Sequence, residues 1–498
     1  MHKGFQKCLA LFLALTAAVG SVGCSEARSD APETENAPSA AEKQELPQTA
    51  PETETTLGDD VPELDFGGDT LTFSVTTAYA YEMDAEELTG EVTNDAVFNR
   101  NKKMEDRFNV TIDETAVNNP SHTEHQAFIR QSIAAMDNSF DIAAVYVYYA
   151  GDLVLENLFT SWDSIPYVNL DNPWWVSKIN KTFTVGGRLY TAVSDLCVTS
   201  MQLAYSYLFN RKIAADYDVE NLYDVVDEGR WTLDCEYELT KNFYVDLNGN
   251  GKRDVKDVYG LLSDVNTSLD CYYAACGQPL LVEGEDGLDV VLKSERALTI
   301  YEKVNRIINE NDGAFLIYHG QNGMSYDSKY AIFMNDSALL MPVRLSALYN
   351  QLRDMESDFG IIPYPKGDEA QEDYLTCCLD NYSVLCIPNV FTDYGMIGAL
   401  AEALSCESKI SVMPAFYESA LQDKYSRDER SVKMLDLIMD GRTYDLSVLF
   451  TYLSGLKNFM TEGIRNQLPF ASNYESRERM IQKGADKVYK MLSELGSP

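Results

Sequence analysis

The order of predicted strands and helices between residues 66 and 147 constrains the fold of this chain more than any other feature. In the segment DTLTFSVTT, Leu71, Phe73 and Val75 fall on one face at a spacing of two, which predicts a β-strand. The segments TNDAVFNRNKKMEDRFNVTID and TEHQAFIRQSIAAMDNSFDIAAVYV each predict a helix followed by another strand. Strand–helix–strand repeats favour a parallel sheet with right-handed crossovers, so we predict an α/β protein.

The amino terminus has the layout of an export signal. Residues 1–23 combine a basic start with an apolar run that is too short to span a bilayer. The sequence SVGC resembles the cleavage site of a bacterial lipoprotein signal, which would make Cys24 the lipidated residue. The alternative is an ordinary signal peptide in which this cysteine is coincidental. The two acyl chains of a diacylglyceryl group on Cys24 would suffice for stable anchoring.

An acidic tether is predicted after the signal. Residues 24–62 are rich in Pro, Glu, Thr, Ala and Ser and have hardly an apolar side chain to bury, so we expect them to be disordered. The composition changes after Pro62, and the folded body is predicted to comprise residues 63–498. The formal net charge of −38 repels nucleic acid and anionic lipid headgroups, and we expect neither as a partner.

A loop with the ligand spacing of an EF-hand lies within the segment YVDLNGNGKRDVKDVYG. Calcium requires hard oxygen ligands at alternate residues, a glycine at the sharp turn and a carboxylate at the last position of the loop. The chain provides Gly251 at the turn and, as ligands, Asp246, Asn248, Asn250, Lys252 (through its carbonyl), Asp254 and Asp257. Because the sequence contains only one such loop, we predict a structural Ca2+ site rather than a sensor. The alternative is a solvated turn.

The sequence lacks the common signals for catalysis. It contains no GxSxG, HExxH or GxxxxGK[ST] motif, so we predict that the protein is not an enzyme. His122 and His125 stand one turn apart near a helix start, and we expect exposed histidines there rather than metal ligands. The cysteines after Cys24 include no CxxC pair and are expected to be small buried side chains, although Cys271 and Cys276 could form a disulfide.

Later segments occur in an order that is typical of one family of receptors. In chain order they are LDNPWWVSKINKTFTVGGRLYTAVSDL, GRWTLDCEYELTKNF, KYAIFMNDSALLMPVRLSAL, DFGIIPYPKGD and YSRDERSVKMLDLIMDGRTYDL. Together they resemble bacterial extracellular solute-binding protein family 1, the carbohydrate-type lipoprotein receptors of ABC importers. The resemblance covers nearly all of the chain after about residue 66. It implies a type II periplasmic-binding-protein fold, in which two discontinuous α/β lobes are joined by a hinge.

The resemblance also implies a division of the body into lobes. The first lobe is expected to contain about residues 66–185 and 325–375, and the second about residues 186–324 with much of 376–498. Within GRWTLDCEYELTKNF, Thr232 is expected to cap a helix. Trp231 is expected to pack in the core and seat that helix.

Aromatic and polar side chains near predicted strand ends are the candidate ligand contacts. Sugars bind to aromatic platforms that have carboxylate, amide or guanidinium groups beside them, and clefts of open α/β sheets form where strands end. From the residues themselves we single out Tyr146, Tyr148, Tyr149, Asp152, Trp174, Trp175, Tyr272 and Tyr273, with Tyr417 as a weaker candidate. The family resemblance adds Asp195 and Arg344 at its ligand-turn positions. For each ring, packing in the core is the alternative.

The resemblance and the amino terminus together predict the substrate-binding subunit of an ABC importer, lipid-anchored on the extracytoplasmic face of the cell membrane. Such a protein would capture an oligosaccharide by hinge closure, act as a monomer and dock onto permease subunits. Two alternatives remain open. One is a solute-binding protein for a peptide or another non-sugar solute, and the other is a surface glycan-binding protein or glycoside hydrolase.

Overall fold

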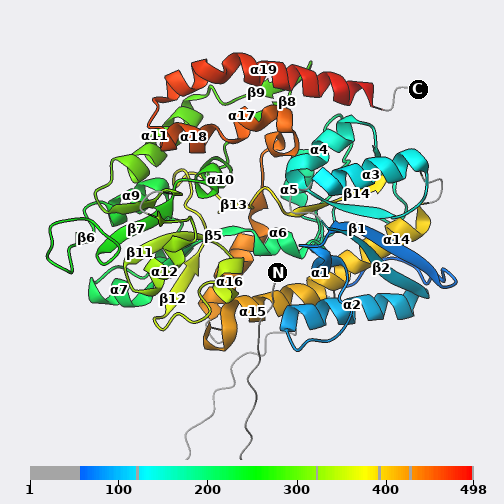
Figure 1. Ribbon diagram of the computed structural model, residues 1–498, viewed down its shortest axis with the longest axis horizontal. Helices are drawn as coiled ribbons and strands as arrows, with labels where there is room; N and C mark the ends of the chain where they lie inside the picture. The colour runs from blue at the N-terminus through cyan, green and yellow to red at the C-terminus, as the bar shows by residue number, and fades with distance from the viewer. Residues whose placement is uncertain (1–56, 119–122, 321–322, 391–393, 426–428, 496–498) are drawn as a thin grey trace, which may run out of the picture. The chain divides into compact units, whose positions relative to one another are not determined.

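The computed structural model describes residues 57–118, 123–320, 323–390, 394–425 and 429–495. The predicted signal peptide (1–23), the lipidation site Cys24 and most of the predicted tether lie outside the described residues. The described residues form two large mixed β-sheets and two small two-stranded sheets, with helices packed around them (Figure 1). In this part of the chain, no helix combines the length and the apolar character needed to cross a bilayer.

The first sheet has the strand order β2-β1-β3-β14-β4. Its strands are β1 (Asp69–Thr76), β2 (Val110–Val117), β3 (Ile142–Tyr146), β4 (Phe159–Thr160) and β14 (Ser383–Pro388). β1 pairs in parallel with β2 and β3, as the strand–helix repeats predicted, whereas β14 is antiparallel to β3 and β4. The helices in this stretch of chain are α1 (Ala80–Met83), α2 (Val92–Phe108), α3 (Thr123–Ala135), α4 (Val147–Leu155) and α5 (Ser177–Phe183).

The second sheet has the order β10-β7-β11-β5-β12, and β6 pairs with β7. Its strands are β5 (Tyr205–Asn210), β6 (Tyr244–Val245), β7 (Val258–Asp264), β10 (Ala314–Ile317), β11 (Ala338–Arg344) and β12 (Phe359–Ile362). The helices that connect them are α7 (Arg211–Asp216), α8 (Leu222–Asp227), α9 (Leu233–Thr240), α10 (Thr267–Ala275), α11 (Glu295–Asn309), α12 (Ser328–Met334) and α13 (Ser346–Tyr349). β7 is parallel to β10 and β11, and β5 is antiparallel to β11 and β12.

The positions of β11 and β12 correct the predicted division into lobes. We expected residues 325–375 in the first lobe, but β11 pairs with β5 and β7, and β12 pairs with β5, all in the second sheet. The strand that returns to the first sheet is β14. A buried strand's sequence determines its apolar character but not the sheet it joins, because both sheets offer apolar neighbours. Below, the first lobe is the first sheet with its helices, and the second lobe is the second sheet with its helices.

Three segments that connect the lobes pack against one another. Their elements are α6 (Val198–Gln202), which leads into β5, then β13 (Thr376–Cys377), which precedes β14, and β15 (Arg442–Thr443). The first two segments meet at the bridge between Ala204 and Cys378, and β13 pairs in parallel with β15. Arg442 is buried there and forms an ion pair with the buried Asp195 at 2.6 Å. We call these three segments the hinge.

The carboxyl-terminal quarter of the chain is mainly helical. It contains α14 (Gly395–Glu407), α15 (Met413–Tyr425), α16 (Glu429–Asp440), α17 (Ser454–Lys457), α18 (Phe459–Arg465) and α19 (Phe470–Glu494), with the short turns η4 (Leu446–Leu449) and η5 (Thr451–Leu453). α19, drawn in red along the top of Figure 1, packs against η5 and against β9 (Leu288–Val290), which forms a hairpin with β8 (Leu281–Glu283). A Cβ on Gly484 would lie 2.5 Å from the Tyr452 carbonyl oxygen, so α19 and η5 are in close backbone contact.

Local sequence signals explain where several helices begin and end. Thr232 caps α9 as predicted, because its Oγ1 accepts a hydrogen bond from Cys235 N at 3.2 Å. Trp231 is fully buried, also as predicted, and donates its indole N–H to Pro363 O at 2.8 Å. α2 ends at Asn109, whose left-handed backbone (φ 49°) closes the helix.

The histidine and cysteine predictions have mixed outcomes. His125 is buried rather than exposed, and its Nε2 is hydrogen-bonded to the Ser74 hydroxyl at 2.8 Å; His122 lies outside the described residues. The eight described cysteines are free, so Cys271 and Cys276 are not paired, and all but one are buried as expected.

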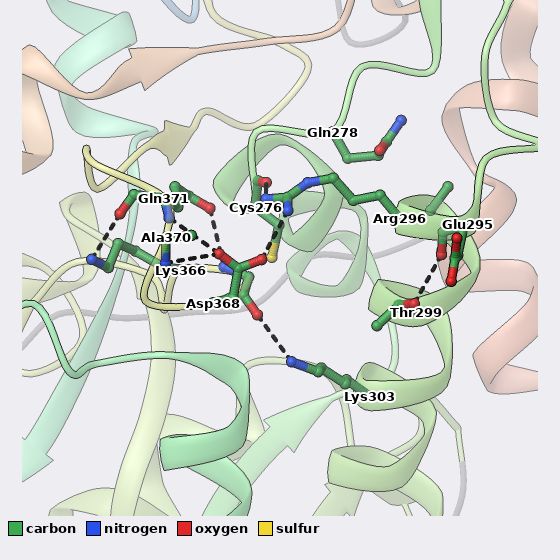
Figure 2. A network of polar contacts seen from close by, with 12 residues as sticks. Cys276, Gln278, Glu295, Arg296, Thr299, Lys303, Lys366, Asp368, Ala370 and Gln371 are labelled. Carbon is green, nitrogen blue, oxygen red and sulfur yellow. Dashed lines mark hydrogen bonds and ion pairs between the residues drawn. The ribbon is translucent and has the colours of Figure 1, made fainter.

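The loop after β12, which contains PYPKGD, is held by a network of polar contacts (Figure 2). The Arg296 guanidinium on α11 forms an ion pair with Asp368 at 2.8 Å and donates to the Cys276 carbonyl at 2.8 Å. Lys303, two turns further along α11, donates to Gly367 O at 3.2 Å. The loop therefore fastens the end of the second sheet to α10 and α11, and its main role in the fold is structural.

Candidate functional site

A cavity of about 820 Å³ lies where elements of both lobes meet. Its first-lobe wall consists of α1, the loop after it and the first turns of α2, which follow the carboxyl end of β1. Its second-lobe wall consists of α13 and the turn after it, which follow the carboxyl end of β11. The polar and aromatic lining includes Tyr81, Glu91, Gln202, Tyr349, Arg353 and Glu418. Ligands of open α/β sheets bind outside the carboxyl ends of strands, so this cavity is the candidate ligand site.

The first-lobe wall is fixed by hydrogen bonds to the hinge and to α15. The hydroxyl of Tyr81, whose side chain is exposed, donates to Gln202 Oε1 on α6. Glu91 caps α2, because its carboxylate accepts from Thr93 N at 3.2 Å and Asn94 N at 2.6 Å. The same carboxylate accepts from Ser419 Oγ on α15 at 3.2 Å. The start of α2 is thereby joined to the segment that forms the floor of the cavity.

The second-lobe wall presents one aromatic ring and several polar groups. Tyr349 packs edge-to-face on Phe416 of α15, with ring centroids 6.1 Å apart. Burial raises the pKa of Tyr349 well above its ordinary value, so the phenol stays neutral and can donate a hydrogen bond. Among the described residues, neither Arg353 nor Glu418 has an ion-pair partner, which leaves both charges available to a ligand. One tyrosine from each lobe, with amide, guanidinium and carboxylate groups beside it, is a composition suited to sugars.

Of the predicted tyrosines, Tyr146 at the end of β3 is connected to the cavity ring Tyr81 through Tyr79. The ring of Tyr79 contacts Tyr81 at 6.4 Å and Tyr146 at 4.8 Å between centroids. Tyr148 and Tyr149 follow, 4.9 Å apart and half-buried. The cavity itself is lined by Tyr81 but not by the predicted Tyr146, Tyr148 and Tyr149.

Arg344 lies at the end of β11 and is half-buried, and its role as a ligand contact stays a prediction. Burial raises the pKa of Tyr79 well above its ordinary value, and the Arg344 guanidinium offsets part of that rise. The end of β11 is therefore within electrostatic reach of the segment after β1. Tyr417, the weaker candidate, is half-buried on α15 next to Glu418, which lines the cavity.

Three predicted ligand contacts belong to the core or the hinge instead, which corrects those predictions. Trp174 and Trp175 are each 2% exposed and donate their indole N–H groups to the Glu402 carboxylate, at 3.0 and 2.9 Å. Asp195 is 1% exposed and forms the hinge ion pair with Arg442. The two indole N–H groups are satisfied without a ligand, and each Asp195 oxygen faces a cation, Arg442 at 2.6 Å and Lys409 at 3.6 Å.

Three more predictions are corrected in the same way. Tyr272 is buried, and its hydroxyl is hydrogen-bonded to the Tyr207 hydroxyl at 2.6 Å. Tyr273 is buried and donates to Ala297 O at 3.2 Å. The Asp152 carboxylate accepts from Thr451 N at 3.2 Å and so joins α4 to η5. The sequence suggested these side chains as ligand contacts because a tyrosine or an aspartate looks the same in a sequence whether it packs inside the protein or contacts a ligand.

The sequence reasoning missed most of the cavity lining. Tyr81, Gln202, Tyr349, Arg353 and Glu418 were not predicted as ligand contacts. A usable signal existed for one of them, because Tyr81 lies shortly after the carboxyl end of a predicted parallel strand. Tyr349 lies shortly after β11, which the structure shows to be parallel to β7. The other three come from the hinge, a turn and α15, and only the tertiary fold brings them to the same place.

The predicted calcium loop adopts the local turns that such a loop requires. Asp246 Oδ2 accepts from Gly251 N at 2.8 Å, and Gly251 has a φ of 68° that favours glycine. Asn248 Oδ1 accepts from Asn250 N at 3.0 Å, and Asn250 Oδ1 accepts from Lys252 N at 2.6 Å. These turns wrap the backbone around the side chains in the first half of the loop.

Two carboxylate oxygens in this loop are buried without a hydrogen-bond partner in the described structure. They are Asp246 Oδ1 and Asp257 Oδ1. Asp257 is fully buried, and its other oxygen accepts from Asp254 N at 3.0 Å and Tyr244 OH at 3.1 Å. Unpaired buried carboxylate oxygens are costly unless a cation or a donor satisfies them, so these atoms fit a bound cation.

The remaining carboxylate of the loop is already engaged. Asp254 accepts from the side-chain amides of Asn248 (3.2 Å) and Asn250 (2.8 Å). Within the described residues, no three His, Cys, Asp or Glu side chains gather as a metal-ligand group. A cation in this loop would accordingly depend on amide and backbone carbonyl oxygens beside the carboxylates of Asp246 and Asp257, and Ca2+ accepts such ligands.

Comparison with known proteins supports the fold and not a closer relationship. No protein-family model matches the sequence, and no curated protein is similar to it. Solved structures of two-lobed binding proteins share its fold. A cyclo/maltodextrin-binding protein complexed with maltotetraose has a TM-score of 0.55 at 13% identity, over 84% of this chain and 97% of that chain.

Two further structures give the same result. UspC of M. tuberculosis has a TM-score of 0.54 at 13% identity, over 84% of this chain and all of that chain (100%). The maltose-binding periplasmic protein MalE of Listeria monocytogenes, in complex with maltose, has a TM-score of 0.53 at 14% identity, over 83% and 97% of the two chains. The chain thus has the two-lobed α/β fold of the periplasmic-binding proteins, as the resemblance implied.

Proposed function

We propose that the chain is the extracytoplasmic substrate-binding subunit of an ABC importer and that it captures an oligosaccharide in the cavity between its lobes. The observation that carries this proposal is the position of the cavity, at the carboxyl ends of β1 and β11 and lined from both lobes. A ligand that contacts both walls stabilises the closed arrangement of the lobes, because only that arrangement offers both sets of contacts. Complexes with maltotetraose and maltose among the proteins of the same fold support a sugar as ligand.

The residues that line the cavity favour sugar binding without hydrolysis. Glycoside hydrolysis generally needs two carboxylates that flank the bond to be cleaved. Two carboxylates, Glu91 and Glu418, line the cavity. The Glu91 carboxylate caps α2 and accepts a hydrogen bond from Ser419, so Glu418 has no second free carboxylate opposite it in the lining. A surface glycan-binding protein that feeds no transporter and a receptor for peptides are the remaining alternatives.

A thermal-shift screen of residues 25–498 tests the ligand class. Maltose, maltotetraose, other oligosaccharides, short peptides and free amino acids are each added in calcium. A ligand at about one hundred times its dissociation constant raises stability by roughly 2.7 kcal/mol, which is visible as a rise in Tm. We expect a shift confined to oligosaccharides and no cleavage product by chromatography. A shift given only by peptides, or release of shorter sugars, would refute the sugar-receptor proposal.

Point variants of the cavity test the site. Tyr81→Ala and Tyr349→Ala should each weaken sugar binding about tenfold, equivalent to about 1.4 kcal/mol, because each removes one aromatic wall. Tyr167→Ala is the matched control, since Tyr167 is 45% exposed and does not line the cavity. Isothermal titration gives the affinities. Equal affinities for all three variants would place the ligand elsewhere.

The lipid anchor is proposed from the SVGC sequence at Cys24 and is tested separately. The full-length chain is expressed in a bacterium supplied with an alkyne-labelled fatty acid. We expect the label on the wild type and its loss in Cys24→Ala, together with release of that variant from the membrane fraction. Retention of the label by Cys24→Ala would contradict lipidation at this residue.

We also propose that the loop from Asp246 to Asp257 binds one Ca2+ as a structural element of the second lobe. The two unpaired buried carboxylate oxygens support this proposal. The loop connects β6 to β7, and Arg253 within it donates to Ala314 O at 2.7 Å on β10. An ion that fixes the loop would therefore stabilise one edge of the second sheet. Among the described residues this edge lies outside the cavity lining.

Calcium removal tests this second proposal. EDTA should lower the Tm of the wild type, and added Ca2+ should restore it. Asp257→Asn should abolish that response, whereas Asp286→Asn, an exposed aspartate on the β8–β9 hairpin, should keep it. If Asp246→Ala with Asp257→Ala abolished sugar affinity while stability held, the structural role would be wrong.

A further inference from the structure

Glu82 is a buried carboxylate directly behind the wall of the cavity. It is the residue after Tyr81 in α1 and is fully buried. Its Oε2 accepts a hydrogen bond from the backbone N–H of Thr199 at 2.8 Å, and its Oε1 accepts from the Ser383 hydroxyl. Both carboxylate oxygens are thus engaged by donors from other parts of the chain.

One donor belongs to the hinge and the other to the first sheet. Thr199 is in α6, which leads into the second lobe, and Ser383 opens β14, to which the chain returns from that lobe. The two segments are also joined directly, since Ser383 N donates to Thr199 Oγ1 at 3.0 Å. Glu82 therefore holds α1 against both α6 and the start of β14, where these two segments are hydrogen-bonded to each other.

A second contact attaches α1 to α6 at the cavity wall itself. Tyr81 donates its hydroxyl to Gln202, which lies on α6 as Thr199 does. Consecutive residues of α1 thus contact α6 at two places, one inside the cavity and one beneath it. A ring held by its own hydroxyl alone could pivot, whereas a second attachment through the next residue restrains the backbone that carries the ring.

Among the groups around Glu82, the two hydrogen-bond donors make the main interactions with its carboxylate. Arg100 of α2 is buried nearby, but its guanidinium donates to the backbone carbonyls of Glu82 and Met83, at 3.1 and 3.0 Å, and not to the carboxylate. The other groups that interact electrostatically with Glu82 are Tyr79, Tyr81, Tyr146 and Cys197. Burial raises the pKa of Glu82 to about 7, although the bonds from Ser383 and Thr199 lower it. A neutral group of the same shape can make the same two contacts.

We propose that Glu82 is a positioning residue of the ligand site, which couples the Tyr81 wall of the cavity to the hinge. The inference rests on the proposed function, in which closure of the lobes accompanies ligand binding. When the lobes rotate, α6 moves relative to the first lobe, whereas Ser383 in β14 stays with that lobe. The Glu82 carboxylate transmits that movement to α1 and so to Tyr81. Its hydrogen bonds carry this role, and its charge is not required.

Hydrogen exchange of the ligand-free protein tests the proposal directly. Glu82→Ala removes both acceptors, and we expect amides in residues 79–95 and 197–204 to exchange on the order of ten times faster. Glu82→Gln should behave like the wild type, because its amide oxygen can accept from Thr199 and its NH2 can donate to Ser383 Oγ. If Glu82→Ala does not fold, Glu82→Asp replaces it, since its shorter side chain reaches only one of the two donors.

Glu236→Ala is the matched control, because Glu236 is equally buried in the second lobe and is hydrogen-bonded by Tyr207 and Tyr272. It should lower global stability without faster exchange in those two segments. Equal exchange in Glu82→Ala and the wild type, or equal acceleration by Glu236→Ala, would overturn the positioning role. Loss of the Glu82→Gln rescue would instead show that the charge is needed, and would also overturn it.

Binding provides the second readout, with maltotetraose as the probe. Glu82→Ala should weaken its affinity about tenfold, whereas Glu82→Gln and Glu236→Ala should not. Failure of maltotetraose and of the other oligosaccharides to bind the wild type would refute the proposed function. The exchange experiment needs no ligand, and so it judges Glu82 independently of that outcome.

Discussion

Replacement of Glu236 by glutamine should make the protein more stable above neutral pH. Glu236, on α9, is fully buried, and its Oε1 accepts from Tyr207 OH at 2.7 Å and Tyr272 OH at 3.1 Å. Its Oε2 has no hydrogen-bond partner in the described structure. Burial raises the pKa of this carboxyl from 4.5 to about 7, although the two tyrosine hydroxyls lower it. Glutamine keeps the shape and one acceptor oxygen for both hydroxyls, and it cannot ionise.

The sign and the size of the effect follow from that shift. Between pH 4.5 and about 7 the folded state retains a proton that the unfolded state has lost. The contribution of Glu236 to the free energy of unfolding is therefore present at low pH and falls as the pH rises through this window. The gap in pKa corresponds to about 3 kcal/mol at full ionisation. Glu236→Gln should match the wild type near pH 4.5 and exceed its stability by up to about 3 kcal/mol at pH 8.

The assay is urea unfolding of wild type and variant at several pH values from 4.5 to 8.5, followed by circular dichroism. The difference between the two free energies isolates Glu236 from other carboxyls with raised pKa values. Glu238→Gln is the control, because Glu238 lies on the same helix but is exposed, and it should not change the pH dependence. A constant difference between Glu236→Gln and the wild type across this range would refute the reasoning, since it would mean that Glu236 ionises equally in both states.

Three other substitutions have outcomes that the structure determines. Arg442→Met should destabilise the protein by about 3–5 kcal/mol in urea unfolding, because it leaves the buried Asp195 carboxylate with only the longer contact to Lys409 Nζ (3.6 Å), and Asp195→Asn added to it should recover part of the loss. Gly484→Ala should cost about 1–3 kcal/mol and expose α19 to limited proteolysis, because the added Cβ would lie 2.5 Å from Tyr452 O. Trp175→Phe should lower the Tm through loss of a 2.9 Å hydrogen bond to a buried carboxylate, while sugar affinity by titration calorimetry stays unchanged.

The parts of the fold that the sequence predicts well are those determined by local patterns. The alternation of Leu71, Phe73 and Val75 identifies β1, and the following helix–strand repeats give the parallel arrangement of the first three strands. The cap at Thr232 and the buried Trp231 are likewise local features. Local sequence does not determine which lobe contains β11 and β12, because a fully apolar strand fits either sheet.

The ligand site is less predictable for a related physical reason. Tyrosine and tryptophan bury large apolar rings and carry a polar atom, so the same residue serves a core and a sugar site. Trp174 and Trp175 are core residues because Glu402, far away in the sequence, accepts both of their N–H groups. Tyr81 belongs to the cavity because Gln202 and the α13 turn lie opposite it in three dimensions. Neither set of partners is visible in a one-dimensional pattern.

The place of β14 has a consequence for how the chain folds. β14 lies inside the first sheet, between β3 and β4, and it is synthesised after every strand of the second sheet. A shorter chain that ends before Ser383 would leave the edge of β3 unpaired, and such edges associate with other chains. The amino-terminal lobe cannot finish folding first, and pairing between segments so distant in sequence is slow. The two lobes should therefore fold and unfold as one cooperative unit, and proteolytic fragments of one lobe should aggregate.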